Sequence, residues 1–417
     1  MRPTGEITAA VPQAPHSSNV ASSSTGMGRF SYSKLYSHFG SAEAIYDCDD
    51  ADVDLLDWLA PHHKRKLLDK SLDHAHEVME WCDYYGVQIV TPADKNYPST
   101  LRVLEKFPAA LYCRGSLPDF DKELCISVVG TRNLTVEGQR NAYNLGYGLA
   151  KGGAIVVSGM AKGIDSAAQK GALYAGGSSI AVLGCGIDVV YPKENFALME
   201  KLARVGAVIT EYPPKTPPIG ANFPVRNRII SALGNATVVV EADLNSGALI
   251  TAKYATEQGK VLFAFPGPVN SFASKGTNKL ISDGAKVATE AIDVLERFMD
   301  SHPFVNLSAS KQRPDLSGTR RVAASTFDES KFYANLKSSV SVKKEDSVMP
   351  PKRCEFDTSC LDEKELMIYN RMEFDKPASL DDLSKIDIEV SELASLITML
   401  EIKGAIESAP GGFYIKK

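Results

Sequence analysis

Two glycine-rich segments in the middle of the chain place a basic side chain beside a turn. Arg132 follows an apolar run that ends in a Gly-Thr pair, and Lys162 lies in the segment SGMAKGID at 158–165. The forked arginine side chain suits phosphate, and free amides of a glycine-rich turn at a helix start also bind anions. The small residues of these turns are Gly130, Ser158, Gly159 and Gly163. The segments predict phosphate binding, although a solvated arginine and a turn without a ligand would explain each one alone.

Two further arginines lie two positions apart in the segment NFPVRNRII at 222–230. If this segment is helical, Arg226 and Arg228 point about 200° apart, so they need not share a target. One of them can contact phosphate, with Asn227 between them, while the other supports the fold. Structural salt bridges for both arginines are the alternative.

A fourth segment, SGALITA at 246–252, follows the end of another apolar run. Its small residues, with Ser246 and Gly247 first, would let a ligand backbone approach, and its amides can bind phosphate. The segments FPGP at 265–268 and KGTN at 275–278 form a fifth candidate. Each segment is a weak signal alone, but several such loops on one sheet edge favour a common site.

No catalytic or metal-binding motif accompanies these basic residues. Residues 122–300 contain no histidine, which removes the commonest general base and metal ligand from the candidate site. The seven cysteines of the chain are widely spaced and form no C-x-x-C pair, so neither a disulfide framework nor a zinc site is expected. We therefore predict a binding protein without catalytic residues, metal or cofactor.

The elements that must position these loops alternate between apolar runs and helical patterns. The runs typical of buried strands begin at residues 126, 154, 180, 207, 236, 261 and 286. Continuous apolar strands that alternate with helices predict a parallel sheet covered on both faces. Of the 31 glycines, 21 lie in residues 122–300, many just after the end of a predicted strand. Ligands of open α/β sheets bind at that edge, so the basic loops are expected to meet there.

Different patterns flank this α/β region. Residues 26–110 are mainly helical in pattern, and the Ser-, Ala- and Pro-rich segment 1–25 before them is expected to be a disordered tail. Residues 301–360 carry 11 serines and little apolar periodicity, which is typical of a flexible linker. Three helical patterns and a hairpin at 361–417 predict a winged helix. The predicted α/β domain thus spans residues 111–300.

The composition limits the possible partners. The 417 residues carry a net charge of −5 and are 44% hydrophobic, so a polycationic chain is excluded and any nucleic-acid site must be a local patch. Residues 122–300 carry 18 basic and 15 acidic residues, whereas 361–417 carry 7 and 12. No run of 18 apolar residues occurs, and the first 25 residues lack the apolar core of a secretory signal. We therefore expect a cytoplasmic protein without a membrane span.

The order and spacing of these motifs resemble those of the DNA-processing protein A family, also called DprA or Smf. The matching motifs are GTR (130–132), SGMAKGID (158–165), GCGIDVVYP (184–192), TEYPP (210–214), FPVRNRII (223–230), SGALITAKYA (246–255) and FPGPV (265–269). The amino-terminal GMG with SKLYSHFGSAEAIY resembles the family's helix-hairpin-helix or SAM-like cap, and the tail resembles its optional winged helix. The resemblance covers about residues 26–300 and 361–417. It implies an extended Rossmann-like, doubly wound and mostly parallel sheet between these two smaller domains.

The resemblance also implies a function. Members of that family form homodimers, bind single-stranded DNA without cutting it, and help to load a RecA-type recombinase during natural transformation. Arg132 and Lys162 match the family's basic DNA-binding positions, and Arg226 and Arg228 match its RNR element. Where the family usually has histidine after GID-x-x-A, this chain has Gln169, so no role of that histidine carries over.

Two other functions remain open from the sequence. Rossmann-like nucleotide phosphoribohydrolases, the LOG family, share this type of sheet and resemble P-G-G-x-G-T-x-x-E, whose glutamate contributes to catalysis. The corresponding loop here reads SGALITA, and Glu257 lies six residues past Thr251, which is a poor match. The other alternative is a transcription factor that reads DNA through the winged helix, but the net charge of −5 over residues 361–417 argues against strong phosphate binding.

Overall fold

A computed structural model describes residues 29–314, 361–372 and short stretches between 378 and 416. The chain forms two units, residues 1–341 and 342–417. The predicted disordered tail at 1–25 lies outside the described residues.

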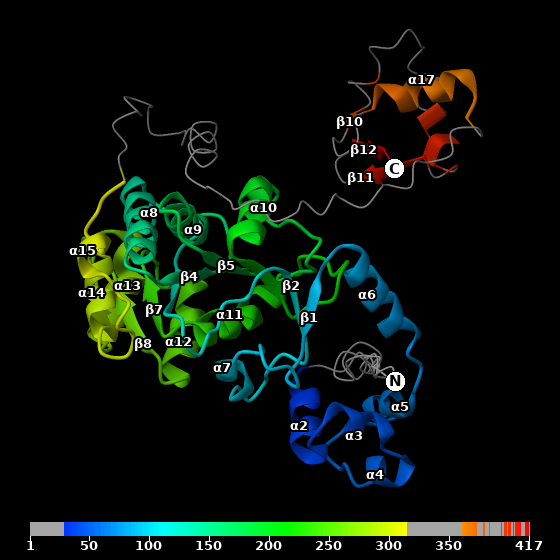
Figure 1. The fold of residues 1–417 in the computed structure, drawn as a ribbon, viewed down its shortest axis with the longest axis horizontal. Coiled ribbons are helices and arrows are strands. Elements are labelled where there is room, and N and C mark those ends of the chain that lie inside the picture. The colour runs from blue at the N-terminus through cyan, green and yellow to red at the C-terminus, as the bar shows by residue number, and fades with distance from the viewer. Residues whose placement is uncertain are drawn as a thin grey trace, which may run out of the picture. The chain divides into compact units, whose positions relative to one another are not determined.

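A nine-stranded sheet forms the centre of the first unit (Figure 1). Its strands are β1 (Gln88–Val90), β2 (Leu111–Gly115), β3 (Cys125–Val129), β4 (Ile155–Ser158), β5 (Ser179–Val182), β6 (Ala207–Thr210), β7 (Ala236–Val239), β8 (Val261–Ala264) and β9 (Lys286–Val287). Their order across the sheet is β1-β2-β6-β5-β4-β3-β7-β8-β9. The β1–β2 and β2–β6 pairs are antiparallel, and the other pairs are parallel. The predicted doubly wound α/β fold is confirmed, and the strand order reverses between β3 and β7.

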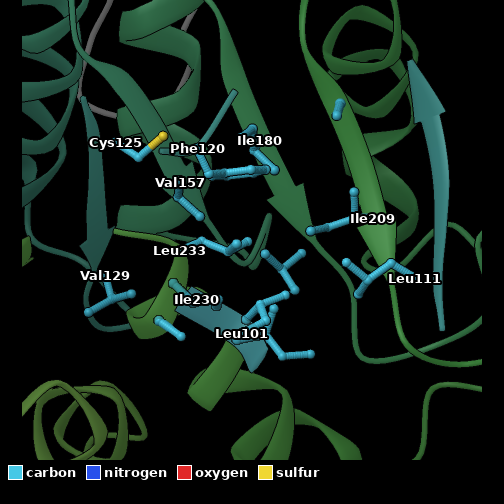
Figure 2. Close-up of a cluster of buried hydrophobic side chains, with 14 of the residues drawn as sticks. Leu101, Leu111, Phe120, Cys125, Val129, Val157, Ile180, Ile209, Ile230 and Leu233 are labelled. Atoms are coloured by element: carbon cyan, nitrogen blue, oxygen red, sulfur yellow. The ribbon is translucent and has the colours of Figure 1, made fainter. Parts of the chain in front are cut away.

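Helices cover both faces of this sheet (Figure 1). They are α8 (Val136–Lys151), α9 (Ile164–Tyr174), α10 (Phe196–Val205), α11 (Asn222–Leu233), α12 (Ala248–Glu257), α13 (Lys275–Ser282) and α14 (Ala291–Leu295), with short 3-10 turns at Lys193–Asn195, Phe272–Ser274 and Glu296–Phe298. Alternate residues of β3 pack on opposite faces: Ile126 and Val128 lie in the core under α8 and α9, whereas Cys125 and Val129 lie in the core under α11 and α12. Figure 2 shows the second of these cores, with Leu233 of α11 among the strand side chains. Burial on both faces explains why the strands are continuous apolar runs in the sequence.

The amino-terminal region is helical up to residue 84. It contains α2 (Arg29–Phe39), α3 (Ala42–Asp47), α4 (Asp50–Asp54), α5 (Pro61–Leu68) and α6 (Asp73–Tyr84), and α7 (Ser99–Arg102) follows β1. We predicted residues 26–110 as one mainly helical domain, but β1 pairs with β2 in the large sheet, with Gln88 opposite Cys113. A three-residue strand cannot stand alone, so it takes the free edge of β2. Leu101 of α7 is likewise buried in the core under α11 (Figure 2).

The predicted linker begins later than residue 301. Helix α15 (Leu307–Ser310) packs on α8, and Ser310 is buried. A Cβ atom at Gly148 of α8 would lie 2.9 Å from the carbonyl oxygen of Ser310, so glycine is what allows this close approach. The serine-rich composition of residues 301–314 therefore concealed a packed segment, and residues 315–360 lie outside the described part.

The second unit contains α17 (Glu363–Arg371) and a small antiparallel sheet. Its strands are β10 (Ala378–Ser379), β11 (Ile406–Ala409) and β12 (Phe413–Lys416), in the order β10-β12-β11. The β11–β12 pair is the hairpin predicted at the end of the chain. Glu365 is buried, where it caps α17 and accepts a 2.6 Å hydrogen bond from the Lys403 ammonium group. A helix packed with a three-stranded sheet fits the predicted winged helix.

None of the helices in the described stretches has the length and hydropathy needed to cross a bilayer.

Candidate nucleic-acid interface

A pocket of about 610 Å³ opens where the strand order reverses, at the carboxyl ends of β3 and β7. Its walls come from the loop after β3, the β4–α9 loop, the loop after β5, the segment between β6 and α11, and the starts of α11 and α12. This is the position at which open α/β sheets bind ligands. Six of the eleven predicted site residues line it: Gly130, Arg132, Arg226, Asn227, Ser246 and Gly247. The structure thus brings together loops that are more than a hundred residues apart in the sequence.

The rim of the pocket, which we define as Arg132 and Lys162, carries exposed cations on two touching loops. Arg132 lines the pocket, with its guanidinium carbon 5.3 Å from the centre of the Phe223 ring, whereas Lys162 lies on the adjoining loop outside the lining. Gly163 has φ +95°, and a Cβ atom there would lie 2.3 Å from the carbonyl oxygen of Thr131. The two loops therefore pack backbone against backbone. Among the described residues, neither Arg132 nor Lys162 forms a salt bridge.

The floor of the pocket, which we define as Arg226 and Asp165, is buried and tied to the sheet. The Arg226 guanidinium donates to the carbonyl oxygen of Gly159 at 3.0 Å and to that of Val182. The Asp165 carboxylate accepts from the Gly159 amide at 3.1 Å. Gly159 fits between these two side chains because glycine has no Cβ. A Cβ atom there would lie only 2.7 Å from both side chains. The chain itself satisfies most of the polar groups of the floor.

Burial shifts the pKa values of both floor residues. It lowers the pKa of Arg226 to about 10, so this side chain remains a cation at neutral pH. It raises the pKa of Asp165 from 3.8 to about 6, although attraction to Arg226 and the hydrogen bonds from the Ala161 and Gly159 amides act in the opposite direction. At neutral pH the two opposite charges offset each other, which leaves the rim as the positive part of the pocket.

Arg228 was predicted to bind DNA, but the structure places its guanidinium group inside the fold, outside the lining of the pocket. Its guanidinium group forms a buried two-pronged salt bridge with Glu211, at 2.8 and 2.7 Å, and also donates to the carbonyl oxygen of Lys106 at 2.9 Å. Helical geometry points Arg228 away from Arg226, as the sequence predicted, and toward Glu211 and Lys106. We call this contact region, which lies outside the pocket lining, the base of α11. The role of Glu211, in the TEYPP motif, could not be inferred before that contact was visible.

Ser158, Gly159 and Gly163 were also predicted as ligand contacts, and all three instead hold the β4–α9 loop. The Ser158 hydroxyl is buried and donates to the carbonyl oxygen of Val128 at 2.6 Å. The Gly159 amide is used by Asp165, and Gly163 packs against the loop after β3. These residues shape the surface on which Lys162 lies.

Asn227, Ser246 and Gly247 form the wall of the pocket at the starts of α11 and α12. The Asn227 side chain donates to the carbonyl oxygen of Gly247 at 3.4 Å and accepts from Arg226 at 3.3 Å, which links α11 to the start of α12. A Cβ atom at Gly247 would meet nothing within 4 Å, so this wall is open. The Ser246 hydroxyl accepts from the Ala248 amide at 3.3 Å, in the turn that leads into α12. Gly130 is needed for packing, because a Cβ there would lie 2.5 Å from Ile164.

Sequence reasoning missed the aromatic residues of the pocket. The Phe223 ring contacts both the Arg132 guanidinium group and the Tyr191 ring, and the two ring centres are 5.2 Å apart. Both aromatic residues line the pocket. The available signal was the aromatic residue just before the arginine pair in the segment at 222–230. Gln169 lies elsewhere: it is buried in α9 and donates to the carbonyl oxygen of Ile180 at 3.0 Å. The departure from the family pattern therefore falls in the core.

No group of three or more potential metal ligands occurs within residues 29–314 or the described parts of the tail.

Comparison with known proteins identifies the family. The model of the DNA recombination-mediator protein A family matches residues 88–299, and that of the DprA winged helix domain matches residues 355–412. The DNA processing protein DprA of Streptococcus pneumoniae is 39% identical over 227 residues, which are 54% of this chain and 79% of that protein. Protein Smf of Escherichia coli is 42% identical over 207 residues, which are 49% of this chain and 55% of that protein.

The solved structures agree with this result. The X-ray structure of DNA processing protein A from Streptococcus pneumoniae superposes with a TM-score of 0.58 and 31% sequence identity, covering 66% of this chain and 94% of that one. Because the family model spans just over half of the residues and includes every loop of the pocket, the chain belongs to the DNA recombination-mediator protein A family.

Proposed function

We propose that this protein binds single-stranded DNA across the rim of the pocket and delivers it to a RecA-type recombinase during natural transformation, in the cytoplasm. The observation that carries the proposal is the contrast between the buried floor, where opposite charges offset each other, and the exposed cationic rim. Polyanionic DNA gains most from cations that the protein leaves without a carboxylate partner. Arg132 and Lys162 meet that condition among the described residues.

Single strands fit this site better than duplex DNA because the pocket presents aromatic rings. Phe223 and Tyr191 both line it, and Tyr191 is 38% exposed. Unpaired bases stack on such rings with little sequence preference, and phosphate contacts add affinity without reading the sequence. We therefore expect binding that is largely independent of sequence.

The proposal includes no chemical step. Asp165 is the one carboxylate that lines the pocket within the described residues, and its charge is already engaged by the Gly159 amide and by attraction to Arg226. Glu257, the acid considered for a phosphoribohydrolase, forms a salt bridge with Lys253 at the far end of α12. Binding without cleavage is the role that these positions support.

We also propose a homodimer through residues 275–290. Val287 is 52% exposed on β9, an edge strand of the sheet, whereas Ala288 is buried and Leu280 packs partly into the core. Among these three apolar residues, Val287 is therefore the one best placed to meet a second copy. A dimer would let two DNA sites act together and raise avidity. Val287→Glu should convert a dimer into a monomer in sedimentation experiments, and a wild-type monomer at micromolar concentration would refute the proposal.

Fluorescence anisotropy with fluorescein-labelled poly(dT), alone and annealed to poly(dA), tests the DNA-binding function. We expect tighter binding to the single strand, and a loss of about tenfold for Arg132→Ala, which removes one charge-assisted contact. Arg140→Ala is the matched control, because Arg140 is an exposed arginine on α8 that pairs with Glu137 and lies outside the pocket. Equal affinity for both DNA forms, or equal losses for the two variants, would refute the proposed site.

A further inference from the structure

One wall of the pocket is a strap without regular secondary structure. The strap, residues 213–221 with the sequence PPKTPPIGA, connects β6 to α11 and contributes Pro218 and Gly220 to the lining. Its last five residues are exposed. Because it contains no helix or strand, its position depends on a few specific attachments.

Three hydrogen bonds between described residues attach the strap to the β5 loop, residues 183–192. The Lys215 amide donates to both carboxylate oxygens of Asp188, at 2.9 and 3.0 Å. The Gly186 amide donates to the carbonyl oxygen of Thr216 at 2.8 Å. Gly186 has to be glycine, because a Cβ atom there would lie 2.6 Å from the Asp188 carboxylate and 2.9 Å from the Lys215 nitrogen. The same loop carries Tyr191, which also lines the pocket.

The attachment holds Lys215 in an unfavourable backbone conformation. Lys215 has φ +66°, and within the described residues only Met160 shares this left-handed region among non-glycine residues. Such a conformation costs a lysine free energy, so it persists only where neighbouring groups hold it. Asp188 supplies two acceptors for the one amide at that position. Met160 lies in the β4–α9 loop, which also carries Lys162 of the rim.

We propose that Asp188 is a positioning residue for DNA: its carboxylate clamps the strap at Lys215 and thereby holds Pro218 and Gly220 in place as a wall of the pocket. This inference rests on the proposed DNA-binding function. It assigns to an exposed acidic residue a role that increases the affinity for a polyanion.

Electrostatics alone predicts the opposite effect. Asp188 is exposed and negatively charged, so removing it should strengthen the binding of DNA by reducing repulsion. The clamp predicts that removing its oxygen acceptors weakens binding, because the wall loses its fixed position before the ligand arrives. The sign of the change therefore separates the two explanations.

Anisotropy with fluorescein-labelled poly(dT) on the full chain provides the test. Asp188→Ala should weaken binding about fivefold, the effect of losing one or two modest hydrogen bonds. Asp188→Asn keeps one oxygen acceptor for the Lys215 amide and should stay within about twofold of the wild type. The slope of log K against log salt should not change in either variant, because no phosphate contact is removed. Circular dichroism should show the wild-type spectrum.

A double-mutant cycle with Lys215→Gly identifies the clamped residue. Glycine adopts the left-handed conformation without steric cost, so in this background Asp188→Ala should cost less than about twofold. Tighter binding of Asp188→Ala, or the same loss with Lys and with Gly at 215, would overturn the proposal. If Arg132→Ala weakens binding while Asp188→Ala does not, the proposed role of Asp188 is refuted and the proposed DNA site is not. If neither variant weakens binding, the proposed DNA site fails as well.

Discussion

The rim of the pocket and the base of α11 use the same residue type in opposite ways. Arg132 on the rim is exposed and forms no salt bridge with any described residue, whereas Arg228 at the base of α11 is buried and bound to both oxygens of Glu211. Arg226 on the floor lies between these extremes, buried and attracted to Asp165. A buried arginine has to be satisfied by the fold, while an exposed one can exchange water for a ligand phosphate. Position, more than residue type, therefore separates structural from ligand-binding cations.

Removing the buried arginine should have the largest effect, and this effect is on stability. Arg228→Ala leaves the Glu211 carboxylate buried without its partner, so we expect the free energy of unfolding to fall by about 3–5 kcal/mol. Urea unfolding of the wild type and the variant measures it. A loss below about 1 kcal/mol would mean that water reaches Glu211, and that the base of α11 is not the closed structural site described above.

The next effect is a pH dependence of stability that comes from the floor. Because burial raises the pKa of Asp165 to about 6, the folded protein binds more protons than the unfolded chain between about pH 4 and pH 6. The free energy of unfolding contributed by this group therefore falls as pH rises through that window, by up to about 3 kcal/mol. Asp165→Asn is the control, because its side-chain amide does not take up or release a proton in this pH range.

Urea unfolding of both proteins at several pH values separates this contribution from all others. The free energy of unfolding of the wild type minus that of Asp165→Asn should decrease from pH 4 to pH 6. A difference that increases over this window would show that attraction to Arg226 outweighs burial. The floor would then be an ion pair stabilised by its own charges.

A smaller effect is expected from removing the second unit. A chain that ends at residue 314 keeps α15 on α8 and should bind poly(dT) within about twofold of the full chain, because residues 361–417 carry a net charge of −5. Gel shifts measure this. Truncation at residue 300 would also remove α15 and is expected to lower the melting temperature. A folded 1–314 chain that no longer binds DNA would show that the tail contributes to the interface.

The sequence predicted the sheet and the place of the site because both follow from local patterns. Apolar runs identified β3 to β9, and glycines after strand ends indicated the edge where Arg132 lies. Helical periodicity also predicted that Arg226 and Arg228 diverge. Which of the two arginines is structural could not be predicted, because this depends on Glu211, which lies directly after β6.

Two further features depended on contacts between distant segments. The pairing of β1 with β2 and the packing of residues 301–314 on α8 are set by surfaces that the sequence does not display locally. The contact between Phe223 and Tyr191 joins the first turn of α11 to the loop after β5, with 31 residues between them in the sequence. For such features a sequence pattern supplies the residue types but not the pairing.

The double variant Arg132→Ala with Lys162→Ala tests most directly whether the rim binds DNA. Its affinity for poly(dT), measured by anisotropy at several salt concentrations, should fall, and the slope of log K against log salt should become shallower by about 1.4, or roughly 0.7 for each lost phosphate contact. Circular dichroism and the Arg140→Ala control should match the wild type. Unchanged affinity and an unchanged slope in the folded double variant would contradict the account, because the two exposed cations would then take no part in binding DNA.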